Sequence, residues 1–341
     1  MVDVANTPAP SGAAKLCKKA GQCAGALIVD SLESDLGFLD EAARFHNTAE
    51  TSRSYPRMSL GTHPVLQNET HVLLFLPKGV RRRDYLFDAL THQLKSRPLV
   101  VVGPRKGGIK AARKVLEKRF ATVTVGGIGN HCQLLIARDS NESTEKPLTD
   151  YERRWSTGLG FDATSYPGTF AEGRLDTATQ LLIKAILEPK VRSNTRVLDL
   201  GCGSGVLGLA LKQQQPAIRL TLADADHLAV AAAKRTTSIS ELGEEDVTVV
   251  ASHGYSKLEG RFDLIVTNPP FHQGVQTNLE VPEMMIAGAP KHLRKGGQFW
   301  LVANRTLPYE KMLQTHFKTV SAVKETSSFK VLRASSPRQA M

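Results

Sequence analysis

Short apolar runs alternate with longer amphipathic stretches along the first half of the chain. Apolar runs at 71–76 and 99–102 are bounded by proline, glycine and charged residues, and each predicts a strand. A stretch with helical character follows each run, at 83–94 and 109–120. This alternation of strand and helix is typical of an α/β fold with parallel strands.

Two further apolar segments predict that the first domain continues to about residue 138. Strands are expected at 123–125 and 132–137, and the glycines between them predict a turn at 126–130. The next stretch, 139–150, is polar and has no apolar period. It therefore predicts a connection between domains.

The second half repeats the alternation more clearly. Asp176 is a candidate N-cap for a helix at 177–187, ahead of the first strand of this half. Helical stretches separate most of the strands, so we expect a doubly wound α/β sheet. Its strands are predicted at 197–200, 220–223, 247–250, 264–267, 299–303 and 329–334.

These patterns divide the 341 residues into four parts. Residues 1–25 are rich in Ala, Pro, Gly and Lys and predict a flexible tail. A first domain is expected at 26–138, a linker at 139–165 and a second domain at 166–336. Two domains also suit a chain of this length.

The composition excludes several classes of protein. No apolar run is long enough to cross a bilayer, and the N-terminal stretch lacks the apolar centre of a secretory signal. The cysteines lack the paired spacing of a metal site and are too few for a disulfide framework. We therefore expect a cytoplasmic protein with no membrane segment and no metal. The cysteines are Cys17, Cys23, Cys132 and Cys202.

Positive charge is concentrated in the first half. The net charge is +11, and residues 78–119 carry 13 Lys and Arg against 3 Asp and Glu. A solvated helix face has a similar pattern, but so one-sided an excess favours a polyanionic partner. We expect RNA there, although charge alone does not distinguish RNA from DNA. The candidate RNA-binding residues are Arg81, Arg82, Arg83, Arg105 and Lys106.

A glycine-rich turn lies between the first strand and the first helix that follows it in the second half. The turn reads Gly201-Cys202-Gly203-Ser204-Gly205 and follows a strand that contains Asp199. Without side chains it lets a ligand approach the backbone, and helix-start amides are left to bind an anionic group. A tight strand-to-helix connection also uses glycines, so this turn alone is weak evidence. The candidate cofactor-binding residues are Asp199, Gly201, Cys202, Gly203 and Gly205; we do not expect Cys202 to be a nucleophile.

Asp224 is a second mark of a nucleotide-like cofactor. It ends the next predicted strand, 23 residues after Gly201. A carboxylate there accepts hydrogen bonds from both ribose hydroxyls. Capping of the following helix would also suit an acid here, and a nicotinamide cofactor is not excluded at this point.

The segment Asn268-Pro269-Pro270-Phe271 directly follows a buried strand and is the candidate catalytic motif. Two prolines stiffen the turn and leave carbonyl groups as acceptors. The side-chain oxygen of Asn268 and the carbonyl of Pro269 are suited to hold the two N–H groups of an amine and aim its lone pair. Phe271 is suited to stack on a base. An ordinary turn with a buried Phe is the competing interpretation.

Together these motifs resemble the amino-group methyltransferases of ribosomal RNA, most closely those that modify the N2 amine of a guanine in 16S rRNA. The resemblance covers most of the chain. It implies S-adenosylmethionine as cofactor and adds Asp176 to the cofactor-binding residues. The residues that carry it are Pro167 to Phe170, Leu175-Asp176, Gln180 to Leu182, 197–207, 268–272, Gly274, Gln276-Thr277 and 302–304.

The resemblance also implies two tandem Rossmann-like methyltransferase domains, of which the N-terminal one is degenerate and binds RNA. The segments 80–83 and 103–110 offer no usable cofactor turn, which agrees with a degenerate copy. We expect a monomer that acts on the assembled small ribosomal subunit. The third strand ends in Ser252-His253, where related enzymes often have an acid or amide for the adenine, so the adenine contact is open.

Other functions remain at this point. Related enzymes act on the N2 amine of a guanine in 23S rRNA, and others methylate adenine N6 or the glutamine of release factors. From a different class, the alternative is an RNA-binding ribosome assembly factor or chaperone that has lost catalysis. The intact glycine turn, Asp224 and Asn268 argue against that last alternative.

Overall fold

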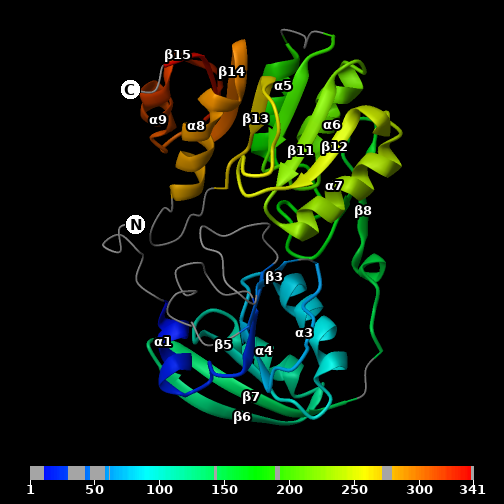
Figure 1. The fold of residues 1–341 in the computed structure, drawn as a ribbon, viewed down its shortest axis with the longest axis vertical. Coiled ribbons are helices and arrows are strands. Elements are labelled where there is room, and N and C mark those ends of the chain that lie inside the picture. The colour runs from blue at the N-terminus through cyan, green and yellow to red at the C-terminus, as the bar shows by residue number, and fades with distance from the viewer. Residues whose placement is uncertain are drawn as a thin grey trace. The chain divides into compact units, whose positions relative to one another are not determined.

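A computed structural model describes residues 11–29, 43–46, 58–60, 62–141, 144–188, 193–270 and 279–338, with the backbone alone for 43–46 and 58–60. The chain folds into two compact units, Met1–Tyr151 and Glu152–Met341. Figure 1 shows each unit as an α/β fold, the first coloured blue to green and the second green to red.

The first unit contains a seven-stranded sheet in the order β3-β2-β1-β4-β5-β7-β6. Its first five strands are parallel, and β7 and β6 run antiparallel to their neighbours. The elements are α1 (Gly12–Lys19), β1 (Ala26–Val29), β2 (Ala43–His46), β3 (Met58–Leu60), β4 (His71–Phe75), α3 (Val80–Leu94), β5 (Leu99–Pro104), α4 (Ile109–Leu116), β6 (Phe120–Gly129), β7 (Cys132–Ser140) and η2 (Leu148–Tyr151).

The second unit contains a seven-stranded sheet in the order β12-β11-β10-β13-β14-β16-β15 and a separate β8-β9 hairpin. Its elements are β8 (Arg153–Ser156), β9 (Asp162–Ser165), α5 (Thr177–Leu187), β10 (Arg196–Leu200), α6 (Val206–Gln214), β11 (Arg219–Asp224), α7 (His227–Ser240), η3 (Glu244–Asp246), β12 (Val247–Ala251), β13 (Phe262–Thr267), α8 (Glu280–His292), β14 (Leu293–Asn304), α9 (Tyr309–His316), β15 (Phe317–Glu325) and β16 (Phe329–Pro337).

The two sheets have the same topology. Counted along each unit's own sheet, both place their strands in the order 3-2-1-4-5-7-6. In both, the last two strands pair antiparallel with each other, and the seventh also pairs antiparallel with the fifth. The prediction of two tandem copies of one α/β fold is therefore confirmed.

Both faces of the second sheet are covered. On β10, Val197 packs in a cluster with residues of α5 and α6, whereas Leu198 packs in a cluster with residues of α8 and α9. Successive side chains of a strand point to opposite faces, so a strand buried on both faces needs a continuous apolar run. This explains why the strands of this half were readable from the sequence.

The predicted tail is wrong for residues 11–25. Ser11 caps α1 through its Oγ, which accepts a hydrogen bond from Ala14 N at 3.1 Å. Leu16 and Cys17 of this helix are buried in a cluster with residues of β1, β5 and β7. The helix is amphipathic but has only 8 residues, and so short a segment among Ala, Pro, Gly and Lys resembles a loose tail in the sequence.

The predicted linker and turn also differ from the structure. The β8-β9 hairpin lies within 139–165 but belongs to the second unit, where Thr164 N donates to Thr236 Oγ1 of α7 at 2.9 Å. The glycines predicted as a turn at 126–130 mostly continue β6, with Gly127 paired opposite Leu134. The helix expected at 109–120 ends at Leu116, because Phe120 already begins β6.

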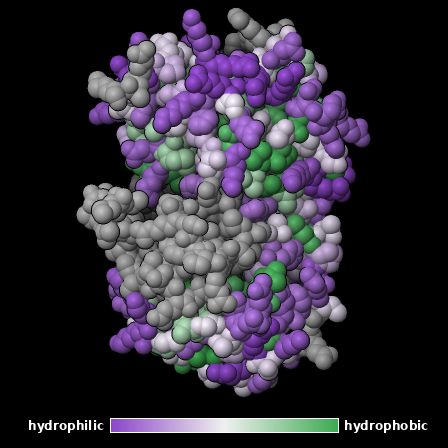
Figure 2. All heavy atoms as spheres, in the orientation of Figure 1, coloured by the Kyte–Doolittle hydropathy of each residue, from purple (hydrophilic) through white to green (hydrophobic). Residues whose placement is uncertain are grey.

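No helix among the described residues is long and apolar enough to span a membrane. The same residues include no group of three His, Cys, Asp or Glu side chains that would hold a metal ion. The four cysteines are buried. Hydrophilic side chains cover much of the face in Figure 2, with scattered hydrophobic residues between them.

Candidate active site

Three strands deliver the candidate residues to one edge of the second sheet. β10 lies between β11 and β13, and all three are parallel. Their carboxyl ends are followed by Gly201, by Ala225 and by Asn268. The strand order reverses beside β10, since β11 follows it on one side and β13 on the other, and ligands of open α/β sheets bind at such a point.

The glycine turn wraps the end of β11. The backbone nitrogens of Gly201 and Cys202 both donate to the carbonyl oxygen of Ala223, at 2.8 and 3.0 Å. Gly201, Gly203 and Gly205 all have positive φ, which favours glycine. A Cβ on Gly205 would lie 2.9 Å from Leu222 Cδ1, whereas one on Gly203 would meet nothing within 4 Å. Gly205 therefore allows close packing, and Gly203 faces open space.

Asp224 is held by backbone hydrogen bonds at the end of β11. Its Oδ2 accepts from Gly203 N at 2.8 Å, and its Oδ1 accepts from Asp226 N at 2.9 Å. Each carboxylate oxygen keeps a further lone pair for another donor. Burial raises the pKa of Asp224 to about 6. The carboxylate is thus ionised at neutral pH and is oriented for an additional donor.

Asp199 is buried under the turn, with 1% of its surface exposed. Its Oδ2 accepts from Gly208 N at 2.9 Å, which ties β10 to the first turn of α6. Burial, together with the nearby charge of Asp224, raises the pKa of Asp199 to about 7. Burial also raises the pKa of the Cys202 thiol well above its ordinary value. A thiol in that state is a poor nucleophile.

Asn268 is anchored through its amide nitrogen. Nδ2 donates to Asp176 Oδ2 at 3.1 Å and to Thr179 Oγ1 at 2.9 Å. Asp176 is also the N-cap of α5, where its Oδ2 accepts from Thr179 N at 3.0 Å. A carboxylate only accepts hydrogen bonds, so it fixes which end of the Asn268 amide faces it. Asn268 Oδ1 is buried, and within the part of the chain that the structure describes it has no hydrogen-bond partner.

The two prolines after Asn268 differ in exposure. Pro269 is buried and Pro270 is exposed. Neither nitrogen can donate a hydrogen bond, so the turn leaves its carbonyl groups as acceptors. Phe271, the fourth residue of the predicted catalytic motif, lies outside the described residues.

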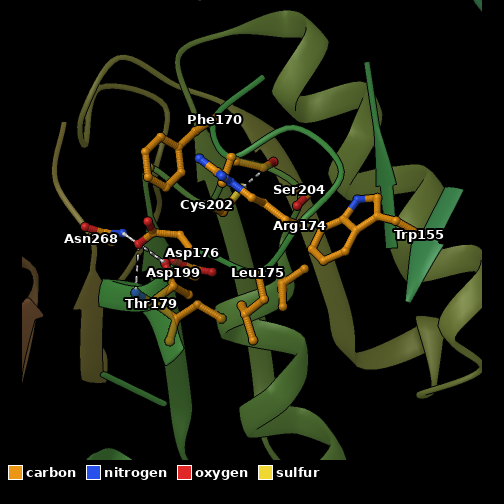
Figure 3. Close-up of a pocket in the computed structure, with 15 residues that line it drawn as sticks. Trp155, Phe170, Arg174, Leu175, Asp176, Thr179, Asp199, Cys202, Ser204 and Asn268 are labelled. Carbon is orange, nitrogen blue, oxygen red and sulfur yellow. Dashed lines mark hydrogen bonds between the residues drawn. The ribbon is translucent and has the colours of Figure 1, made fainter. Parts of the chain in front are cut away.

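A pocket joins the glycine turn to Asn268. It is also lined by Trp155, Phe170, Arg174 and Thr179, none of which the sequence analysis assigned to the site. Figure 3 shows Asn268 and Phe170 on one side of the pocket and Trp155 on the other. Phe170 and Arg174 lie a few residues before the helix N-cap Asp176. This position in the sequence is the signal from which they could have been predicted as site residues.

The sequence matches two family models. Residues 160–333 match the model described as Methyltransferase small domain, and residues 30–155 match Methyltransferase small domain N-terminal. The chain is 36% identical over 265 residues to ribosomal RNA small subunit methyltransferase C of Pseudomonas putida (strain W619), covering 77% of this chain and 78% of that protein. The chain belongs to the ribosomal RNA small subunit methyltransferase C family.

Further comparisons extend the likeness of this methyltransferase over nearly the whole chain. The protein of the same name from Stutzerimonas stutzeri (strain A1501) is 34% identical over 281 residues, covering 82% of each chain. A solved structure of the T. thermophilus 16S rRNA N2 G1207 methyltransferase in complex with AdoMet and guanosine has a TM-score of 0.79 and 23% identity. The structural match covers 95% of this chain and 91% of the T. thermophilus chain, and the two proteins share the fold. The family resemblance seen in the sequence is therefore confirmed.

In this methyltransferase, local hydrogen bonds of Ser252 stabilise the turn that follows β12. Ser252 is buried, and its Oγ donates to Gly254 O at 3.0 Å and accepts from Lys257 N at 3.1 Å. The hydrogen bonds of the Ser252 hydroxyl therefore stabilise the turn in which Ser252 itself lies.

The first unit of the methyltransferase differs from the second where the catalytic motif would stand. β4 corresponds to β13 in the shared topology, and Leu76-Pro77-Lys78 follows it in place of Asn268-Pro269-Pro270. The segment that corresponds to the glycine turn follows β1 and lies outside the described residues. The segment 80–83 begins α3 after β4, and the segment 103–110 starts within the end of β5. Neither therefore occupies the position after β1 that corresponds to the glycine turn.

The structure separates the candidate RNA-binding residues. Arg81, Arg105 and Lys106 are exposed. Arg82 and Arg83 are each only 8% exposed, and Arg83 pairs with Asp84 at 2.7 Å. Successive residues of a helix point in different directions, so three adjacent arginines on α3 do not share one face. The prediction that Arg82 and Arg83 contact RNA at the surface is therefore wrong. For Arg81, Arg105 and Lys106, RNA binding stays a prediction.

Proposed function

We propose that this protein transfers a methyl group from S-adenosylmethionine to the exocyclic N2 amine of a guanine in 16S rRNA. The single observation that carries the chemistry is the buried Oδ1 of Asn268, which has no hydrogen-bond partner among the described residues while its Nδ2 is engaged twice. The substrate is supported by family membership, because the relatives carry a ribosomal RNA small subunit name and the T. thermophilus neighbour a 16S rRNA N2 name.

The residues at the end of β10 and β11 fit a sulfonium nucleoside cofactor. The backbone of Gly203 borders open space, and no side chain of its own blocks the approach of a ligand. Asp224 is ionised at neutral pH and has lone pairs left for two ribose hydroxyls. Gly201, Cys202 and Gly205 shape the turn, and Asp199 holds it against α6. When bound, S-adenosylmethionine supplies an activated methyl group.

Arg174 extends the proposed cofactor site. Its side chain is exposed and lines the same pocket as Gly203 and Asn268. A guanidinium forms strong, charge-assisted hydrogen bonds with a carboxylate. We assign to Arg174 the carboxylate of the cofactor's methionine part. Asp176, expected from the resemblance to bind the cofactor, instead acts in this proposal through Asn268.

The acceptor amine is held by groups that only accept hydrogen bonds from it. The lone pair of a guanine N2 amine is delocalised into the ring, which makes the amine a weak nucleophile. Asn268 Oδ1 and the carbonyl of Pro269 accept from its two N–H groups and favour the tetrahedral geometry of an attacking nitrogen. Catalysis is then mainly positioning and electrostatics. A strong base is not needed, because the proton leaves to solvent after the nitrogen has been methylated.

The proposed partner is the small ribosomal subunit in the cytoplasm, with the protein acting as a monomer. Arg81, Arg105 and Lys106 are exposed cations of the first unit and are proposed to contact RNA phosphates. A 23S rRNA target and a non-catalytic assembly role receive no support from the relatives, whose names specify the small subunit and a methyltransferase.

The test is methyl incorporation from labelled S-adenosylmethionine into isolated small subunits, large subunits and free rRNAs, followed by nuclease digestion to identify the base. We expect N2-methylguanine confined to 16S rRNA. The same product in 23S rRNA would keep the mechanism and change the target. No incorporation, with cofactor binding also absent, would overturn the enzymatic proposal.

A further inference from the structure

Phe170 is a large apolar side chain that the fold leaves 56% exposed beside the candidate active site. Among the described residues, Phe170 is the one aromatic side chain in the set of exposed large hydrophobic residues. The others in this set are Val and Ile. Single exposed apolar residues are common at protein surfaces, and exposure alone indicates no role. Its location is more informative, because the ring lines the pocket on the side of Asn268 (Figure 3).

The loop that carries Phe170 is pinned on both sides of it. Thr169 is buried, and its Oγ1 donates to Tyr166 O at 2.8 Å. Gly173 N donates to Ser165 Oγ at 3.1 Å. Ala171 has a φ of 49°, a left-handed conformation that costs free energy for a residue with a Cβ. The surrounding hydrogen bonds hold this strained backbone, so the exposed position of the ring is set by the loop.

The Asn268 amide restricts how a base can enter. Only Oδ1 is available for the exocyclic amine, because Nδ2 is engaged by Asp176 and Thr179. A hydrogen bond to an exocyclic amine lies near the plane of the base. The two faces of the base are then left to the pocket walls, and Phe170 lines the wall on the Asn268 side. Aromatic rings stack on any base, so such a ring orients the base plane without selecting its identity.

We propose that Phe170 stacks on the target guanine and holds its N2 amine in line with Asn268. This inference rests on the proposed function. It makes Phe170 a substrate-contacting residue whose contribution depends on a flat ring and not on apolar volume.

The test uses the full-length protein with Phe170→Ala, Phe170→Leu and Phe170→Tyr, and with Val323→Ala as the matched control. Val323 is an exposed apolar residue of the same unit, 38% exposed on the edge strand β15. Two properties are measured: the affinity for guanosine in the presence of S-adenosylhomocysteine, by calorimetry, and single-turnover methylation of small subunits. Affinity for S-adenosylmethionine and the melting temperature report whether each variant is folded.

We expect Phe170→Tyr to bind guanosine like the wild type and Phe170→Ala to bind it about 10-fold more weakly. Phe170→Leu is expected to lie close to Phe170→Ala, and all variants should keep cofactor affinity and melting temperature. If Phe170→Leu or Phe170→Ala matched the wild type while the wild type bound guanosine and methylated rRNA, stacking by Phe170 would be refuted and the proposed function would stand. A wild type that neither binds guanosine nor methylates RNA would overturn the proposed function itself.

Discussion

The side-chain nitrogen of Asn268 donates to the Asp176 carboxylate at 3.1 Å although the two residues are 92 positions apart in the chain. Asp176 is the N-cap of α5 and Asn268 follows β13, so a helix start and a strand end share one carboxylate. The hydrogen bond orients Asn268 so that its Oδ1 has no partner among the residues that the structure describes. It therefore links the stability of α5 to the geometry of the proposed amine site.

Substituting Asp176 by Asn separates these two roles. Asn is as good an N-cap as Asp, so α5 should keep its stability. The new amide no longer forces Asn268 to present its nitrogen, and we expect the single-turnover methylation rate to fall about 10-fold or more. Asp176→Ala, which also removes the cap, should lose about 1 kcal/mol of unfolding free energy in addition. Wild-type activity in Asp176→Asn would show that orientation of Asn268 by this carboxylate is unimportant.

Removing the Asn268 side chain should abolish most methyl transfer. Loss of one preorganised group that acts on the reacting centre typically costs about 100- to 1000-fold in rate. Because Asn268 contacts the proposed amine and not the proposed ribose site, the dissociation constant for S-adenosylmethionine in Asn268→Ala should stay within about two-fold of the wild type. Isothermal titration and single-turnover assays on the same preparation measure both. An equal loss of cofactor binding and rate would argue against the assigned role.

Cofactor affinity should depend on the ionisation of Asp224. Its pKa is raised to about 6 by burial, so the carboxylate becomes protonated as the pH falls through 6 and loses acceptor capacity. The dissociation constant for S-adenosylmethionine should therefore rise as pH drops from 7 to 5. Asp224→Asn should bind more weakly at pH 7 and lose most of this pH dependence. An identical pH profile in the variant would place the titrating group elsewhere.

Burial of Asp199 should make the ligand-free protein less stable as the pH rises. Its pKa is about 7 in the folded state against an ordinary value of 3.8. The folded state then binds more protons than the unfolded state between these values, so the free energy of unfolding falls with increasing pH across that window. Asp199→Asn keeps an acceptor for Gly208 N and has no charge to bury.

The measurement is urea unfolding of wild type and Asp199→Asn from pH 4 to pH 8. The variant should gain stability relative to the wild type as the pH rises, by an amount on the order of a few kcal/mol. Asp224 is present in both proteins, so its own titration largely cancels in the difference. A difference that stays constant with pH would contradict the burial of a titrating carboxyl group at 199.

Charge reversal at Arg105 and Lys106 should weaken RNA binding. Both side chains are exposed just after β5. Each lost phosphate contact should reduce the slope of log affinity against log salt by about 1. Arg105→Glu and Lys106→Glu are made singly, and Lys311→Glu on α9 of the second unit is the matched control for each, since it changes net charge equally. Equal losses in the control and the test variants would mean that overall charge, and not this surface, controls binding.

The order of strands and helices in the second unit was largely predictable because the central strands of a doubly wound sheet are buried on both faces and their sequences are almost continuously apolar. The antiparallel edge strand β15 was missed, since its exposed and half-buried positions mix Lys, Thr and Ser with Val. In the first unit, α1 was missed for a different reason, because an amphipathic segment of only 8 residues is too short to be distinguished from a loose tail. Predictions were therefore best where burial was deepest.

The sequence by itself determined which residues are chemically able to form the site. The glycine turn, Asp224 and the Asn-Pro-Pro segment each follow a strand, and the carboxyl ends of parallel strands meet at one edge. Tertiary structure alone decided how the side chains divide their hydrogen bonds. The engagement of Asn268 Nδ2 by Asp176 and Thr179, the burial of Arg82 and Arg83, and the exposed ring of Phe170 depend on contacts between distant segments, and such contacts leave no periodic pattern along the chain.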